Sequence, residues 1–329
     1  MDEAGFEVEA EGESGAGSGD AVGHLPVLMD AVMRLLSPAT GERVVDCTLG
    51  RGGHAEALLR AVGASGGLTG FDLDGGNLAF ARSRLEALIA EGGPAEGAGL
   101  RLVHGSFASL ATALPEGERV DVLLADLGVA SNQIDEPSRG MSFRVADAPL
   151  DMRMDRDSGG PTAADLMNEA PVEQIADWLW RYGEERLSRR IARKIGEARS
   201  RSPIRTTGDL SRIVRAAYGP SGRKQRIDPA TRAFQAIRIV VNGELDALDR
   251  LLQALPGRMA DGGRAALIAF HSLEDRQVKR AMQRWAGDGR GEALTRKPLV
   301  ADAAEQARNR RSRSAKLRVF RFGAGPATG

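Results

Sequence analysis

Three apolar runs in the first part of the chain each end in an aspartate, and a glycine-rich turn follows the first of them. The runs end at Asp46, Asp72 and Asp126, and the turn occupies residues 50–53. A helical pattern over residues 55–62 separates the first two runs. Strand, glycine turn, helix, strand and acid in this order are typical of the nucleotide-binding edge of a doubly wound α/β sheet.

The spacing of the glycines differs from that of a dinucleotide site. A dinucleotide fingerprint reads G-x-G-x-x-G, whereas Gly50 and Gly52 are followed by Ala55 at the third position. Asp46 would place a negative charge near a pyrophosphate, and a carboxylate suits a cation better. S-adenosylmethionine carries both an ammonium and a sulfonium group, so the sequence favours a methyl-donor site. A dinucleotide site, or a tight turn whose nearby acids only cap helices, are the alternatives.

The cysteine and histidine content limits the compartment and the kind of site. Cys47 is the single cysteine, and the four histidines are scattered. This content excludes an internal disulfide, fits a reducing cytoplasm and makes a four-ligand metal site unexpected. No apolar run reaches the ~18 residues that a membrane span requires, and the acidic N-terminus does not resemble a secretory signal. We therefore predict a cytoplasmic protein with no metal and no membrane contact.

The net charge of zero conceals a strong segregation of charge along the chain. Residues 1–20 contain seven acids and no base, and residues 1–22 are predicted to be a disordered acidic tail. Residues 181–226 contain 14 bases and four acids, and a second basic cluster covers residues 308–321. Basic segments of this kind are typical of proteins that bind a polyanion. The alternative is an ordinary solvated helix face.

The order of strand and helix patterns predicts two structural parts. Strands that alternate with helices are predicted at residues 43–47, 68–72, 100–104 and 120–126. The alternation then stops, and residues 137–229 read as helical only. Strand patterns return at residues 263–270 and 316–321. We predict a Rossmann-like α/β domain, formed by residues 23–136 and 230–329, that is interrupted by an all-helical substrate-recognition insert at residues 137–229.

Several longer motifs are unusual enough to compare with known families. They are HLPVL at 24–28, GRGGH at 50–54, HGSF at 104–107, DLGV at 126–129, RGMSF at 139–143, PLDMRM at 149–154, YGEER at 182–186, RAFQAIRI at 232–239 and FHSLEDR at 270–276. Together they resemble the MraW-like (RsmH) family of bacterial 16S ribosomal RNA cytosine-N4 methyltransferases, over roughly residues 23–321. Asn132 stands where the family pattern has proline, and the acidic tail has no counterpart.

The resemblance implies a function and a set of binding residues. It implies S-adenosylmethionine as methyl donor and the N4 amine of a cytidine in the decoding region (P site) of 16S ribosomal RNA as acceptor, within the assembled small ribosomal subunit. The implied donor contacts are Gly52, Gly53, His54, Asp72, Phe107, Asp126 and Gln133. A DNA amino-methyltransferase is an alternative, although residues 126–129 lack its Asp/Asn-Pro-Pro-aromatic run. A second alternative is an RNA-binding assembly factor that uses donor binding as a switch. The oligomeric state stays open, a homodimer included.

The residue types suit these roles. Asp72 can accept hydrogen bonds from ribose hydroxyls or cap the next helix, and Phe107 can cover an adenine face or pack in the core. His54 can offer a ring N–H to the donor's carboxylate or cap a helix. Asp126 is the candidate catalytic residue, although its contact could be the donor, the target amine or both.

A last group of polar residues follows the strand pattern that ends near residue 270. Its members are His271, Ser272, Glu274 and Asp275. They are expected either to line the substrate side of the sheet or to cap a helix, and the sequence leaves both interpretations open.

Overall fold

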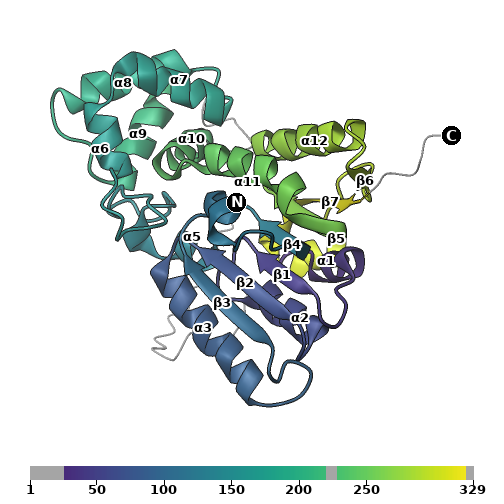
Figure 1. The fold of residues 1–329 in the computed structure, drawn as a ribbon. Helices are drawn as coiled ribbons and strands as arrows, with labels where there is room; N and C mark the ends of the chain where they lie inside the picture. Colours follow the sequence, from purple (N-terminus) through teal and green to yellow (C-terminus); the bar gives the residue numbers. More distant parts are fainter. Residues whose placement is uncertain (1–25, 220–227, 324–329) are drawn as a thin grey trace, which may run out of the picture.

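The computed structural model describes residues 26–219 and 228–323 (Figure 1). The predicted acidic tail and the first two residues of the HLPVL motif lie outside this range. The centre of the structure is a seven-stranded sheet in the order β3-β2-β1-β4-β5-β7-β6. Its strands are β1 Arg43–Asp46, β2 Gly67–Asp72, β3 Gly99–His104, β4 Val120–Asp126, β5 Met259–Ala269, β6 Gly291–Ala293 and β7 Lys316–Phe322.

The topology of the sheet confirms the predicted doubly wound α/β class. Strand β1 pairs in parallel with both β2 and β4. On the outer sides, β2 pairs in parallel with β3, and β4 pairs in parallel with β5. Strand β7 is antiparallel to both of its neighbours. The chain therefore winds outward in two directions from β1, and the crevice at the carboxyl ends of β1 and β4 is where such sheets bind ligands. Asp46, Asp72 and Asp126 end their strands at this edge.

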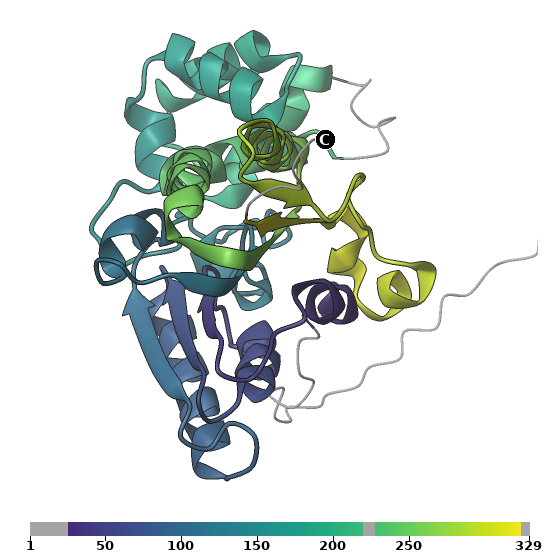
Figure 2. The same ribbon diagram turned by 45° about the vertical axis from the view of Figure 1, so that its right-hand side comes forward.

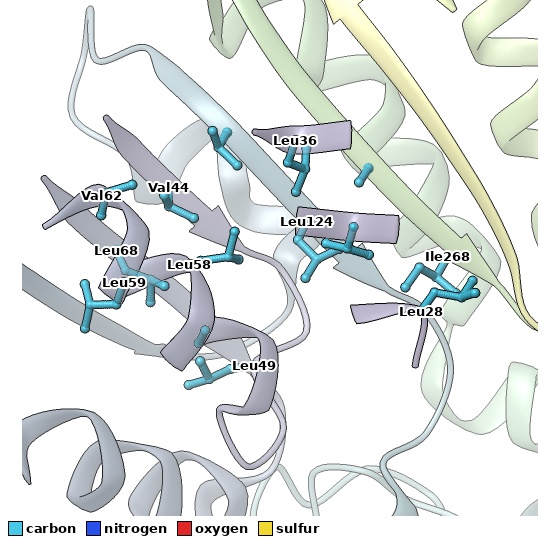
Figure 3. Close-up of a cluster of buried hydrophobic side chains, with 14 of the residues drawn as sticks. Leu28, Leu36, Val44, Leu49, Leu58, Leu59, Val62, Leu68, Leu124 and Ile268 are labelled. Atoms are coloured by element: carbon cyan, nitrogen blue, oxygen red, sulfur yellow. The ribbon is translucent and has the colours of Figure 1, made fainter. Parts of the chain in front are cut away.

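Helices cover both faces of the sheet because consecutive strand residues are apolar and point to opposite faces. One face packs Val44, Leu124 and Ile268 against α1 Met29–Leu36, α2 Gly53–Val62 and α3 Gly75–Ala90 (Figure 3). The other face packs Leu123 and Leu267 against α4 Leu110–Ala113, α11 Glu244–Arg258 and α12 Ser272–Gly287. Each fully buried leucine or isoleucine contributes about 1.5–3 kcal/mol. Within the described residues, no helix is long and apolar enough to cross a membrane.

A separate group of helices lies above the sheet in the views of Figures 1 and 2. It contains α6 Ala163–Glu169, α7 Val172–Gly183, α8 Ser188–Arg199, α9 Thr207–Tyr218 and α10 Ala230–Asn242. Thr206 caps α9 in a capping box with Asp209, and Thr162 caps α6 in the same way with Asp165. The group has its own apolar core, separate from the two cores of the sheet.

Helix α10 changes the proposed boundary between the two parts. The pattern of residues 230–255 reads as one continuous helix of the sheet domain, but Gly243 divides it with a φ of 60°. Phe234 and Ile237 of α10 pack in the core of the helical group, whereas Leu248 and Leu252 of α11 pack on the sheet. We therefore propose Gly243, rather than residue 229, as the C-terminal limit of the helical part.

Candidate functional site

A pocket of about 290 Å³ opens where β1, β2, β3 and β4 end. Segments from distant parts of the chain meet in its wall, including the glycine turn, the loops after β2 and β4, and residues near the C-terminus. The predicted donor residues that line it are Gly53, His54, Asp72, Phe107, Asp126 and Gln133. Phe107 also packs against the apolar core, so it has both roles that the sequence allowed. Whether these residues bind a donor stays a prediction.

Gly52 does not line the pocket, and its backbone conformation explains why it is glycine. Its φ is 78°, in the left-handed region that favours glycine. A Cβ at this position would point toward Ala81 of α3, at 3.5 Å, and not toward the pocket. At Gly53, a Cβ would lie 2.6 Å from Cγ of Pro26. The two glycines thus serve the shape of the turn and its packing, and whether they also contact the donor stays a prediction.

Asp72 is held in place by backbone groups on both sides. The Gly50 N–H donates to its Oδ2 at 2.7 Å, and the Asp74 N–H donates to its Oδ1 at 2.8 Å. Burial raises the pKa of Asp72 to about 6. The cap of α3 is Asp74, which accepts from the N–H groups of Gly76 and Asn77, so Asp72 is not the helix cap. Each carboxylate oxygen keeps a lone pair for a further donor such as a ribose hydroxyl.

Helix α5, Ser131–Asp135, is tied to the start of α3. Gln133 donates from Nε2 to Asp74 at 2.9 Å and accepts the Ala130 N–H at 3.0 Å. Its amide is thus engaged within the protein and fixes the loop after β4. Asn132, the residue found in place of proline, donates to Oδ1 of Asn77 at 2.8 Å. Both asparagines line the pocket.

His54 is buried and neutral. Its Nε2 lies 3.0 Å from the Val27 carbonyl oxygen, which can only accept, so Nε2 carries the proton. Burial lowers the pKa of His54 to about 4. The remaining nitrogen, Nδ1, faces Oδ2 of Asp126 at 4.0 Å and has no proton to give. In this tautomer the ring presents an acceptor on that side, and a contact between His54 and the donor stays a prediction.

Asp126 stands beside two other buried acids. Burial raises the pKa of Asp126 to about 8, and the nearby charges of Asp46 and Glu274 add to the rise. Asp46 lies behind the pocket wall, is 1% exposed and accepts the Thr48 N–H at 3.0 Å. Burial likewise raises the pKa of Asp46, to about 7. A bound cation would relieve this crowding of carboxyl groups and lower both pKa values.

Three residues that line this pocket each have one buried polar atom without a hydrogen-bond partner in the described structure. These atoms are Nδ2 of Asn77, Oδ1 of Asp126 and Nη1 of Arg311. Buried polar groups are normally paired, so such atoms mark the place of a ligand. Nδ2 of Asn77 needs a hydrogen-bond acceptor, Oδ1 of Asp126 needs a cation or an N–H donor, and Nη1 of Arg311 needs an anion. S-adenosylmethionine offers hydroxyl oxygens, an ammonium with a sulfonium, and a carboxylate, and so fits the pocket.

Comparison with known proteins decides the family. The family model of MraW methylases matches residues 21–323. This chain belongs to the MraW methylase family. Relatives named ribosomal RNA small subunit methyltransferase H include those of Sorangium cellulosum, 47% identical over 306 residues, and Acidobacterium capsulatum, 46% identical over 296 residues. The alignments cover 91% and 90% of this chain, and 90% and 97% of the relatives.

Similarity to this chain also extends to solved structures. An rRNA methylase from Streptococcus thermophilus is 12% identical, with a TM-score of 0.40, and the match covers 90% of this chain and 93% of that chain.

The FHSLEDR motif forms the start of α12. The Nδ1 of His271 accepts the Glu274 N–H at 3.4 Å, and the Glu274 carboxylate accepts the His271 N–H at 3.3 Å. These two bonds form a capping box, in which the cap is His271 and not Ser272, and a role of these residues toward the substrate stays a prediction. Ser272 instead donates to Glu184 of the YGEER motif at 2.9 Å, and Arg276 pairs with Glu184 at 2.8 Å. The two motifs therefore join the helical group to α12.

Three side chains near this cap lie close enough together to bind a metal ion. One ligand atom each of Glu244, His271 and Glu274 lies within 4.8 Å of the others. Arg238 already engages Glu244 with two bonds of 2.8 and 2.9 Å. The guanidinium supplies the positive charge that a metal would bring, so the cluster is electrostatically balanced. The prediction that the protein needs no metal stays a prediction.

Proposed function

We propose that this protein transfers a methyl group from S-adenosylmethionine to the N4 amine of a cytidine in the decoding region of 16S ribosomal RNA. The observation that carries the donor assignment is the set of unpaired polar atoms in the pocket, whose polarities match those of S-adenosylmethionine. Membership of the MraW methylase family, with relatives named for methylation of small-subunit ribosomal RNA, supports the acceptor. We further propose the assembled small subunit as substrate and the cytoplasm as location.

To promote this reaction, the protein must mainly align the target amine with the methyl group and provide a proton acceptor. When bound, the donor supplies an electrophilic methyl carbon. The cytosine amine is a weak nucleophile because its lone pair is delocalised into the ring, and alignment alone is worth about 7–11 kcal/mol. As the nitrogen gains the methyl carbon and the carbon–sulfur bond breaks, the nitrogen must lose a proton. Asp126 offers a buried, unpaired Oδ1 at the carboxyl end of β4 to accept that proton.

The helical part carries the surface that we assign to RNA. Trp180 is 59% exposed and lies between two neighbouring surface pockets. Exposed arginines surround it in these pockets: Arg186, Arg189, Arg190 and Arg232. We call these five residues the Trp180 surface. An exposed indole among arginines suits unpaired RNA, because bases stack on the ring and phosphates pair with the guanidinium groups.

Incubation of the purified protein with small ribosomal subunits and labelled S-adenosylmethionine tests the function. We expect label in 16S ribosomal RNA and a nucleoside of the mass and retention time of N4-methylcytidine. Methylation of DNA and not of RNA would favour the DNA methyltransferase alternative. Donor binding without transfer to any nucleic acid would favour the assembly factor.

The donor assignment predicts a defined loss when Asp72 is replaced. Asp72→Ala should weaken donor binding by about 1–3 kcal/mol, the usual cost of removing one partner of a buried hydrogen bond. Calorimetry with S-adenosylhomocysteine measures this loss. The control is Glu116→Ala, an exposed acid before the amino end of β4, which should leave the affinity unchanged. Tight binding of NAD, with none of S-adenosylhomocysteine, would overturn the assignment.

A further inference from the structure

A short segment near the C-terminus forms part of the donor pocket. Helix α13, Ala303–Arg308, and the 3-10 turn Arg310–Ser314 follow one another along this segment. Glu305 anchors it by accepting the Leu28 N–H at 2.6 Å. Figure 2 shows this yellow segment beside the purple helix α1. Asn309 and Arg311 of the segment line the pocket.

Arg311 is fixed on one side and open on the other. Its Nη2 donates to Oδ2 of Asp135 at 2.7 Å and lies 3.3 Å from the Ser131 carbonyl oxygen, so two contacts from α5 orient the guanidinium. Its Nη1 is buried and has no hydrogen-bond partner within residues 26–219 and 228–323. A buried cationic N–H without a partner is costly, and an oxyanion is the group that best satisfies it.

The other arginines of the pocket wall are already occupied. Arg84 pairs with Glu56 at 2.7 Å, and the guanidinium of Arg51 stacks over the ring of Phe80 at 4.6 Å. The remaining charged wall is acidic, because Asp72 and Asp126 both face the pocket. An anionic group that entered this pocket would be repelled unless a cation received it.

We propose that Arg311 binds an oxyanion in this pocket, and that this oxyanion is the carboxylate of the donor's amino-acid part. The assignment rests on the proposed function, because it takes S-adenosylmethionine as the ligand. The donor has one anionic group, and its ammonium and sulfonium suit the acids of the same wall. Asp135 is then a positioning residue that holds the guanidinium fork toward the ligand. A phosphate of the RNA has the same chemistry as a carboxylate, and the experiment separates the two sources.

Two ligands that differ in the amino-acid part test the proposal by calorimetry. S-adenosylhomocysteine contains the carboxylate, whereas 5′-methylthioadenosine lacks the whole amino-acid part. Arg311→Met should weaken S-adenosylhomocysteine roughly 10–100-fold, the range for a hydrogen bond to a charged group, and should leave 5′-methylthioadenosine unchanged. The affinity of Arg311→Lys for S-adenosylhomocysteine should lie between those of the unaltered protein and Arg311→Met, because lysine keeps the charge but lacks the forked guanidinium. Arg84→Met removes the same charge from the same wall and should not change the ratio of the two affinities.

Three results would overturn the proposal. The first is an equal loss for both ligands with Arg311→Met, which would indicate a structural effect on the pocket. The second is unchanged affinity for both. The third is unchanged donor affinity with weaker binding of ribosomal RNA and a smaller salt dependence, which would assign Arg311 to an RNA phosphate. If the unaltered protein binds neither ligand, the proposed function fails instead. Thermal unfolding of each variant shows that the fold is kept.

Discussion

Replacement of Asp126 by asparagine should slow methyl transfer roughly 10²–10⁴-fold in a single turnover, the span usual for a positioned acid or base. Asparagine keeps the shape and one acceptor oxygen but cannot take up the proton that the amine loses. The affinity for RNA should stay the same, because Asp126 lies at the base of the donor pocket and not on the Trp180 surface. Rapid-quench assays at saturating RNA, with binding measured separately, give both numbers.

The concentration of donor separates the two roles that the sequence left open for Asp126. If Asp126 only binds the donor, the variant should recover its rate when S-adenosylmethionine is saturating. Full recovery would remove Asp126 from the chemical step and leave it as a donor ligand. A rate that stays low at saturating donor would place the carboxylate at the target amine, which must leave its base stack to reach the pocket.

The same variant should be more stable than the unaltered protein although it is less active, and the gain in stability should depend on pH. Burial raises the pKa of Asp126 from 3.8 to about 8, so the folded protein holds a proton that the unfolded chain releases. Stability from this group is complete below about pH 4 and is lost as pH rises through about 8. Asparagine has no such loss, so Asp126→Asn should unfold at a higher temperature than the unaltered protein without donor, increasingly so toward pH 8.

The sheet could be predicted because its signals are local. An apolar run that ends in an acid identifies a parallel strand and its carboxyl end, so the three runs alone suffice to place Asp46, Asp72 and Asp126 at one edge. Strand β6 was missed because three residues are too few to show a period. The break at Gly243 was also missed, since a single glycine between two helical patterns is compatible with a continuous helix.

Details of the site depend on contacts that local sequence does not encode. The tautomer of His54 depends on the Val27 carbonyl oxygen, which accepts a hydrogen bond from the ring Nε2–H. Arg311 was counted only within a basic cluster, although α5, 180 residues earlier in the chain, turns it toward the pocket. Asn132 did stand out as a departure from the family pattern, but its bond to Asn77 exists only because α3 and α5 meet in the folded chain. Pattern thus located the pocket, and tertiary packing determined which atoms remain available in it.

Replacement of four of the five residues of the Trp180 surface should weaken RNA binding far more than any single change in the donor pocket. Stacking of one base on an exposed indole is worth about 1–3 kcal/mol, and each phosphate contact adds nearly tenfold at about 0.1 M salt through counterion release. A variant with alanine at Trp180, Arg186, Arg189 and Arg190 should therefore bind small-subunit RNA roughly 10³–10⁵-fold more weakly. Filter binding over a series of salt concentrations should show a slope reduced by about three.

A matched variant separates a specific surface from general charge. Arg34, Arg82 and Arg250 are exposed arginines on α1, α3 and α11, outside the helical part. Their replacement by alanine removes as many charges as the surface variant removes at its arginines, yet it should leave affinity and salt slope nearly unchanged. Donor binding should be intact in both variants, because neither set lines the donor pocket. Equal losses of RNA affinity in the two variants would show that binding depends on net charge alone, and would contradict the assignment of the Trp180 surface as an RNA-binding site.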